Sequence, residues 1–179
     1  IRQRAKAVIL CANGTESARL LLLSKSARFP NGLANTNDVV GRYLMLGNTV
    51  SASGLFEHDL NDYKGVVTGA AIVDFVPSDP KRGFYGGGRM TARGFDTPIN
   101  YALRGLQPGA PRWGAAYKQA LRDEANHKMT ITSFVTQLPL ATNRVDLDPE
   151  VKDAWGLPAM RITSQSHGDD IKNMEFFRQ

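Results

Sequence analysis

The sequence of 179 residues is poor in the residue types that most often carry metal or redox chemistry. It contains a single cysteine, which excludes an internal disulfide and a cysteine-based zinc site. Its apolar runs are too short to span a bilayer. Cys11 ends an apolar stretch, so we expect it to be a buried small hydrophobe rather than a nucleophile.

Histidine is also scarce, which limits the candidates for imidazole chemistry. The three histidines are His58 in a charged turn, His127 at the end of an expected helix and His167 in a polar loop. Such settings are typical of solvated, structural histidines, although a catalytic role stays open for each.

The formal net charge of +5 comes from loosely scattered basic residues. Nucleic-acid binding would call for a basic stripe with interleaved aromatics or a known motif, and the sequence has neither. We therefore predict no nucleic-acid partner and a mildly basic surface. Arg89 and Arg93 follow three glycines and are either surface residues or groups that reach a polar substrate.

The N-terminal segment has the pattern of a strand, a turn and a helix. Residues 7–12 are uniformly apolar and predict a buried strand of the parallel type. A helix over residues 15–25 should follow, with Thr15 as its N-cap. Such a unit brings backbone N–H groups against a phosphate or nucleotide. Because its neighbouring strands must come from elsewhere, we expect the chain to be part of a larger protein.

The remainder predicts an α+β fold with a largely antiparallel sheet backed by helices. Expected helices begin near Pro111 and cover residues 169–177. Gly86–Gly88 lack the spacing of a dinucleotide fingerprint and indicate a bulge or close backbone approach. The expected strands cover residues 70–76, 84–90, 129–137, 143–148 and 158–163.

Two further patterns have a structural and a functional interpretation. Trp113 and Tyr117 fall on one helical face, which favours core packing over a substrate platform. Four carboxylates could suggest a metal loop, but they lack the spacing and glycine of a calcium loop, so we predict no metal site. These carboxylates are Asp146, Asp148, Glu150 and Asp153.

Four stretches in order resemble the glucose–methanol–choline (GMC) oxidoreductases, which are flavoproteins that oxidise alcohols and sugars. The similarity is greatest to the bacterial branch that includes gluconate and sorbitol dehydrogenase large subunits. The stretches are Leu10–Thr15 with Arg19–Leu22, Phe29–Asn35 with Val40–Met45, Asp79–Phe84, and Leu138–Pro139 with Asn143–Pro149 and Lys152–Pro158.

The resemblance implies an FAD-dependent enzyme that oxidises alcohol or sugar (polyol) hydroxyls by hydride transfer to the flavin. Residues 1–45 would form the tail of a doubly wound FAD-binding domain, and residues 46–179 a substrate-binding domain. By the same resemblance Ala12, Asn13, Gly14 and Thr15 would contact FAD, mainly through backbone. The family's Gly-rich fingerprint would precede this chain and its catalytic histidine would follow it, so we expect a fragment without catalytic residues that does not retain FAD.

The chain departs from the family pattern at two places. Ser17-Ala18 replaces a frequent Thr-Pro, and Leu46-Gly47 stands where a histidine often follows. The second departure leaves the role of this loop near the flavin open. The alternative function is a non-catalytic α+β binding or interaction module. The compartment, bacterial cytoplasm or periplasm, also stays open, and an unpaired strand edge would favour self-association.

Overall fold

The computed structural model describes residues 4–66, 68–93 and 98–179, which divide into two compact units. Unit 1 combines Ile1–Leu46 with Leu138–His167, and unit 2 combines Gly47–Gln137 with Gly168–Gln179. In this part of the chain the elements are four α-helices, short 3-10 and π turns and two antiparallel sheets, so the α+β prediction is confirmed. None of the described helices is both long and apolar enough to cross a bilayer.

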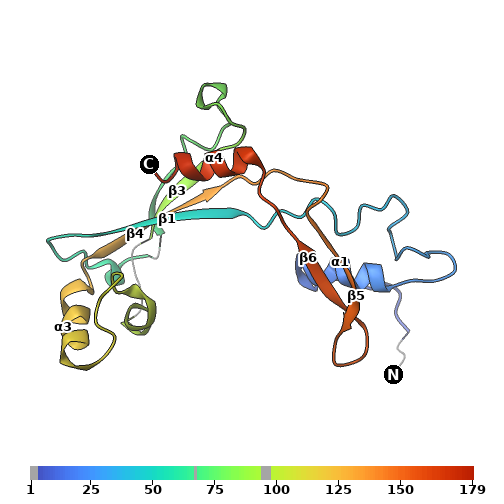
Figure 1. Ribbon diagram of the computed structural model, residues 1–179, viewed down its shortest axis with the longest axis horizontal. Helices are drawn as coiled ribbons and strands as arrows, with labels where there is room; N and C mark the ends of the chain where they lie inside the picture. Colours follow the sequence, from blue (N-terminus) through green and yellow to red (C-terminus); the bar gives the residue numbers. More distant parts are fainter. Residues whose placement is uncertain (1–3, 67, 94–97) are drawn as a thin grey trace. The chain divides into compact units, whose positions relative to one another are not determined.

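Unit 1 is a helix packed on a β-hairpin (Figure 1). Helix α1 (Asn13–Leu23) lies against strands β5 (Arg144–Lys152) and β6 (Pro158–Thr163), which pair antiparallel. A loop bonds to the free edge of β5, since the N–H of Val145 donates to the carbonyl of Gly41 at 2.8 Å. An added Cβ at Gly41 would overlap the carbonyl oxygen of Val145, which explains the glycine there.

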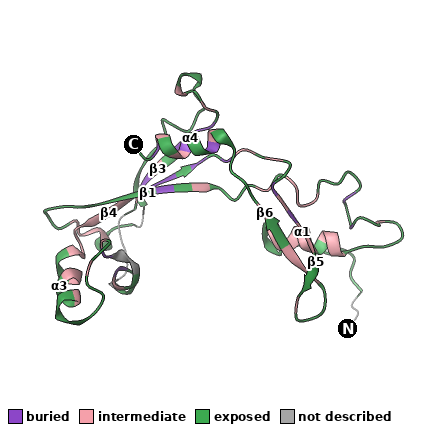
Figure 2. Ribbon diagram, in the orientation of Figure 1, coloured by how far each residue is buried: buried purple, intermediate pink, exposed green. Residues whose placement is uncertain are grey.

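Unit 2 is a four-stranded antiparallel sheet with one helix on its face (Figure 1). Helix α4 (Gly168–Phe176) packs on β1 and β4, and Val50, Val135 and Phe177 are buried there (Figure 2). The strand order is β1 (Asn48–Leu55), β4 (Lys128–Val135), β3 (Gly88–Arg93) and β2 (Thr68–Ile72).

The remaining elements of unit 2 are short turns and one longer helix. Tyr117 of α3 (Gly114–Glu124) donates from its hydroxyl to the carbonyl of Ala102 at 2.8 Å. Trp113, in contrast, is 85% exposed, so the core prediction for this residue is wrong. The short elements are η1 (Asp62–Lys64), η2 (Pro80–Arg82), α2 (Pro98–Asn100) and the π turn η3 (Tyr101–Gly105).

The predicted buried strand at residues 7–12 is not formed. These residues have no regular structure, Val8 and Ile9 are 81% and 84% exposed, and Cys11 is exposed rather than buried. A strand is stable only with a neighbour that accepts its backbone hydrogen bonds, and none of the described strands lies beside this segment. The helix predicted after it is confirmed as α1.

Three details of the sheets also differ from the sequence expectations. The strand β1 was not expected, because its sequence NTVSASGL is small and polar. Residues 73–76, expected as strand, contain a turn closed by a hydrogen bond from the N–H of Val76 to the carbonyl of Val73. Strand β5 continues to Lys152, beyond the end of the strand expected over residues 143–148.

The close approach predicted for Gly86–Gly88 is confirmed. An added Cβ at Gly87 would overlap the carbonyl oxygens of Phe75 and Val76, and one at Gly88 would lie 2.9 Å from the Phe177 ring. The carbonyl of Gly87 accepts from the Thr136 N–H at 2.9 Å and from the Asn173 side chain at 3.0 Å. These glycines therefore let α4 and a neighbouring loop reach the sheet.

Candidate functional site

The predicted cofactor-contacting turn forms the N-terminus of α1. Its backbone enters the helix through Asn13, whose φ of 58° lies in the left-handed region that asparagine tolerates well. The side-chain oxygen of Asn13 accepts from the N–H of Thr15 at 3.0 Å and from that of Glu16 at 2.9 Å. The predicted cap at Thr15 is therefore wrong, since Thr15 only donates its hydroxyl to Asn13 at 3.0 Å.

Two backbone donors at this helix start are directed away from the helix. The first four N–H groups of an α-helix have no acceptor inside it, and Asn13 caps two of them. The N–H groups of Asn13 and Gly14 then remain for another acceptor. A Cβ at Gly14 would meet no atom within 4 Å, so nothing in the described chain explains this glycine. The donor set fits one contact to an anionic or carbonyl oxygen.

An arginine fixes α1 to the hairpin. Arg19 donates through Nη2 to Asp153 Oδ2 at 2.7 Å and to the carbonyl of Pro158 at 2.8 Å. The other oxygen of Asp153 accepts the N–H groups of Trp155 and Leu157 at 2.9 and 3.0 Å. The guanidinium of Arg19 is the main cause of the lowered pKa of Asp153. This carboxylate thus orders the hairpin turn and binds the helix at once.

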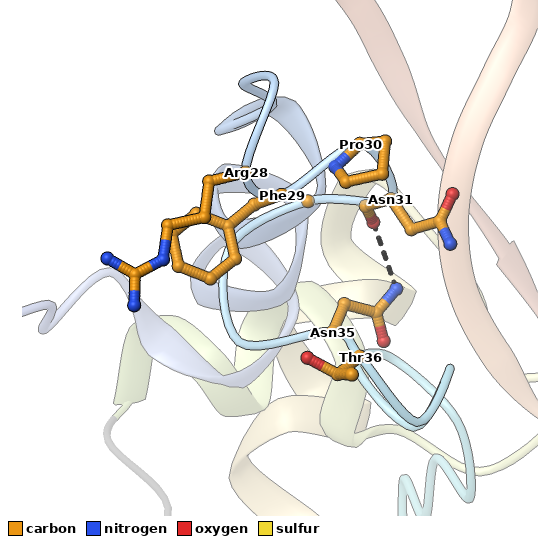
Figure 3. Close-up of a pocket in the computed structure, with 7 residues that line it drawn as sticks. Arg28, Phe29, Pro30, Asn31, Asn35 and Thr36 are labelled. Carbon is orange, nitrogen blue, oxygen red and sulfur yellow. Dashed lines mark hydrogen bonds between the residues drawn. The ribbon is translucent and has the colours of Figure 1, made fainter.

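The chain after α1 encloses a small hollow of about 140 Å³ (Figure 3). Its lining includes Phe29, Pro30 and the buried Asn35. Asn35 donates to the carbonyl of Asn31 at 3.0 Å and accepts the N–H of Val40 at 3.0 Å, which are intraloop bonds. Because Asn35 is committed to the loop, we interpret the hollow as a feature of loop packing.

The carboxylates considered as metal ligands are engaged by other groups. Asp146 accepts two bonds from Arg161, at 2.8 and 2.9 Å, and contacts Arg144 at 2.7 Å. Arg161 is the main cause of the lowered pKa of Asp146. Asp148 accepts the N–H groups of Val151 and Glu150, which lowers its pKa. In residues 4–66, 68–93 and 98–179 no three His, Cys, Asp or Glu side chains form a metal-binding group.

His127 has structural contacts in unit 2. Its Nδ1 lies 3.0 Å from the carbonyl of Phe56, and its Nε2 lies 3.2 Å from Asp59 Oδ1. The ring of His58 packs edge-on against Phe56, with centroids 5.7 Å apart. These contacts support the structural interpretation of both histidines.

The face of the unit 2 sheet opposite α4 carries a row of hydroxyl groups that the sequence analysis missed. Thr132 lies between Ser51 and Thr91 in register, and its hydroxyl is 3.1 Å from that of Ser51. One row along, Ser53 and Thr130 are 2.8 Å apart. Alternating Ser and Thr in NTVSASGL and KMTITSFV was the available signal. Arg89 and Arg93 share this face with Thr91, because side chains alternate along a strand.

Comparison with known proteins gives three relatives that are named as dehydrogenases. The chain is 38% identical over 173 residues to the 2-methyl-1,2-propanediol dehydrogenase of Mycolicibacterium austroafricanum, covering 93% of this chain and 31% of that protein. It is 29% identical to the gluconate 2-dehydrogenase flavoprotein of Pantoea cypripedii, covering 97% of the chain and 29% of the relative. It is 28% identical to the fructose dehydrogenase large subunit of Gluconobacter japonicus, covering 89% of the chain and 29% of that protein.

These relatives identify the chain as similar to oxidoreductases that act on small alcohols or sugars, one of them named a flavoprotein. The chain spans about a third of the length of the relatives it matches. No protein-family model matches it.

Proposed function

We propose that this chain is part of an FAD-dependent oxidoreductase of the GMC type that oxidises alcohol or polyol hydroxyl groups. The observation that carries the proposal is the similarity, along nearly the whole chain, to three dehydrogenases of alcohols and sugars. The four stretches that resemble the GMC family support it. The three relatives do not favour the alternative of a non-catalytic binding module.

In this proposal the start of α1 contacts FAD through the turn Ala12, Asn13, Gly14 and Thr15. The N–H groups of Asn13 and Gly14 donate to a polar oxygen of the cofactor, and the positive end of the helix favours that contact. The absence of a side chain at Gly14 allows close approach. When bound, FAD would supply the acceptor for a hydride that leaves the alcohol carbon.

The remaining parts of unit 1 hold this turn in place. Asn13 closes the first turn of α1, while Arg19 ties the next turn to Asp153 and Pro158 of the hairpin. The contact to the cofactor is thereby presented on an ordered helix rather than a loop, which preserves its geometry. Unit 2 supplies a wall of the substrate pocket.

The test uses the full-length protein that contains this chain, with the variant Gly14→Val. Because a side chain at Gly14 meets no atom in the described chain, Gly14→Val leaves the fold intact. If FAD lies against this turn, the variant loses most of its bound flavin, read from the visible spectrum after desalting. Gly54→Val is the matched control, since an added side chain at Gly54 also meets nothing within 4 Å.

Two outcomes contradict the proposal at different levels. Full flavin content and turnover in Gly14→Val would remove this turn from the cofactor site. A wild-type protein that is colourless, and that does not reduce a dye with any alcohol or polyol, would overturn the proposed function.

A further inference from the structure

The inference concerns the segment that follows β1, residues 56–61, and the turn that precedes β4. The segment forms no helix or strand, so its position depends on contacts to neighbouring parts of the chain. Both of its ends are bonded to Asn126 and His127 of the turn. Phe56 donates its N–H to the carbonyl of His127 at 2.7 Å, Leu60 to the carbonyl of Asn126 at 2.8 Å, and Asn61 to the side-chain oxygen of Asn126 at 2.7 Å.

The imidazole ring of His127 adds two side-chain contacts to the same segment. Its Nδ1 lies 3.0 Å from the carbonyl oxygen of Phe56, and its Nε2 lies 3.2 Å from Asp59 Oδ1. Neither a backbone carbonyl nor an ionised carboxylate can donate a hydrogen bond. A neutral imidazole has one N–H group and the imidazolium has two. Both contacts are therefore hydrogen bonds only when the ring is charged.

The two contacts of the ring differ in how easily they are given up. The side chain of His127 is 26% exposed, whereas that of Asp59 is 64% exposed. An exposed carboxylate exchanges a protein donor for water at little cost. The carbonyl of Phe56, in contrast, belongs to a residue whose N–H is bonded to the His127 carbonyl. A ring with one proton therefore keeps it on Nδ1, toward Phe56, and releases Asp59.

Charged groups on the elements around the ring have other defined contacts. The carboxylate of Glu124, in α3, accepts from the Tyr101 hydroxyl at 3.2 Å. The ammonium of Lys128, in β4, lies 5.7 Å from the centroid of the Tyr101 ring. The carboxylate in contact with the imidazole is that of Asp59, which therefore responds to the charge of the ring. The other ionisable side chains of the segment and of η1 are Glu57, His58, Asp62, Tyr63 and Lys64.

We propose that His127 is a pH-sensitive clamp on residues 56–61, which the imidazolium holds through Asp59 and the neutral ring releases. Histidine side chains change their charge between about pH 5 and 8. The clamp is closed at the acidic end of this range and opens as pH rises. Its sign is opposite to that of the paired carboxylates of unit 1, whose contribution is lost as pH falls. The segment after β1 thus has a held and a released state.

The experiment measures amide hydrogen exchange by mass spectrometry in the full-length protein that contains this chain, at about pH 5.5 and about pH 8. Exchange times are scaled for the intrinsic pH dependence of amide exchange. In peptides that cover residues 56–61 we expect protection to be about two- to fivefold lower at the higher pH, the range expected for one exposed ion pair. Peptides of β4 keep the same protection at both pH values.

Three variants assign the effect to the pair of His127 and Asp59. The pH dependence should vanish in His127→Gln, because an amide does not titrate in this range. It should also vanish in Asp59→Asn, because the new amide can either donate to or accept from the ring. This second variant changes an exposed side chain and so preserves the fold. His58→Gln is the matched control and should keep the pH dependence, since the His58 ring packs on Phe56.

Two results would overturn the clamp. One is equal protection of residues 56–61 at both pH values in the wild-type protein. The other is a pH dependence that persists in Asp59→Asn or disappears in His58→Gln. Neither result depends on bound flavin or on turnover, so the proposed function is tested separately.

Discussion

At the scale of single residues, the glycines of this chain differ sharply in what they allow. Gly87 lies where two backbone carbonyls and the Asn173 side chain converge, whereas Gly54 of β1 faces open space. Geometry requires glycine at the first position, whereas nothing in the described chain requires it at the second. Backbone atoms cannot move aside as a flexible side chain can, so the two positions should respond very differently to the same substitution.

Gly87→Ala should therefore destabilise unit 2 by about 2–4 kcal/mol, because the new Cβ overlaps the carbonyls of Phe75 and Val76. Gly54→Ala should leave the free energy of unfolding unchanged or raise it by less than about 1 kcal/mol. Urea unfolding of both variants measures the difference. Equal stability of the two variants would mean that the loop at residues 75–76 does not pack on Gly87.

Asp146 makes the stability of unit 1 sensitive to acid. Its pKa is lowered, mainly by Arg161, so its carboxylate is more easily ionised in the folded state than in the unfolded state. The stabilisation is therefore present above the unfolded pKa, about 4, and is lost as pH falls through the lower folded pKa. Asp148 and Asp153, also with lowered pKa, add to the same trend.

We expect the melting temperature to fall as pH decreases below about 4, and Asp146→Asn to flatten this dependence. At neutral pH the same variant should melt a few degrees lower, roughly 2–5 °C, because Arg144 and Arg161 lose their shared partner. Thermal melts between pH 2.5 and 7 check both expectations. Glu150→Gln, on the same strand but with an exposed side chain, serves as the control. A parallel pH dependence in Asp146→Asn and wild type would contradict the prediction.

At the scale of elements, helix α1 is capped by Asn13 and not by Thr15, the residue expected from the sequence. Replacing Asn13 by Ala removes the acceptor for two N–H groups and puts Ala at a positive φ. We expect a loss of about 1–2 kcal/mol in Asn13→Ala and a smaller effect in Asn13→Asp, which keeps the acceptor. Amide exchange of Thr15 and Glu16 should accelerate in the first variant. Unchanged exchange in both would show that the cap is dispensable.

The sequence predicts an element well when local periodicity stabilises it, and poorly when its stability comes from pairing with a distant strand. Helices α1 and α4 and strands β4 and β6 follow from local periodicity and were expected close to their observed bounds. The segment 7–12 has a strand pattern but no strand beside it in the described chain, so local pattern alone misleads. Strand β1 shows the reverse, since its small polar residues form a strand only because β4 supplies eight paired positions.

The candidate sites also differ in whether the sequence alone predicts them. The turn at Asn13 and Gly14 was visible in the sequence, because small residues before an apolar helix are a local signal. The row of hydroxyl groups on the unit 2 sheet was not, because it needs Ser51, Thr91 and Thr132 from three strands that only tertiary pairing brings together. The Thr91 hydroxyl is buried without a hydrogen-bond partner in the described part of the chain, which no one-dimensional pattern reveals.

At the scale of the whole molecule, the described chain leaves large apolar side chains uncovered in both units. In unit 1 these include Val8, Ile9 and Trp155, the last of which is 85% exposed at the hairpin turn. In unit 2 Trp113 is equally exposed. Exposed apolar side chains in such number are typical of surfaces that contact other protein. The relatives, about three times as long, provide sequence that could supply such contacts.

We therefore expect the 179-residue chain, produced alone, to self-associate and to bind no FAD tightly. The cofactor contact that we propose amounts to the backbone N–H groups of Asn13 and Gly14, which are too few to hold a dinucleotide. Light scattering over a range of concentrations should give a rising mass, and the desalted protein should be colourless after incubation with FAD. The double variant Val8→Ser with Ile9→Ser should reduce the association, because the exposed segment at residues 7–12 offers apolar side chains and unpaired backbone groups. A monomeric, yellow protein that reduces a dye with polyols would show that the described units hold a complete flavin site, and the assignment of α1 as one contact among many would then be wrong.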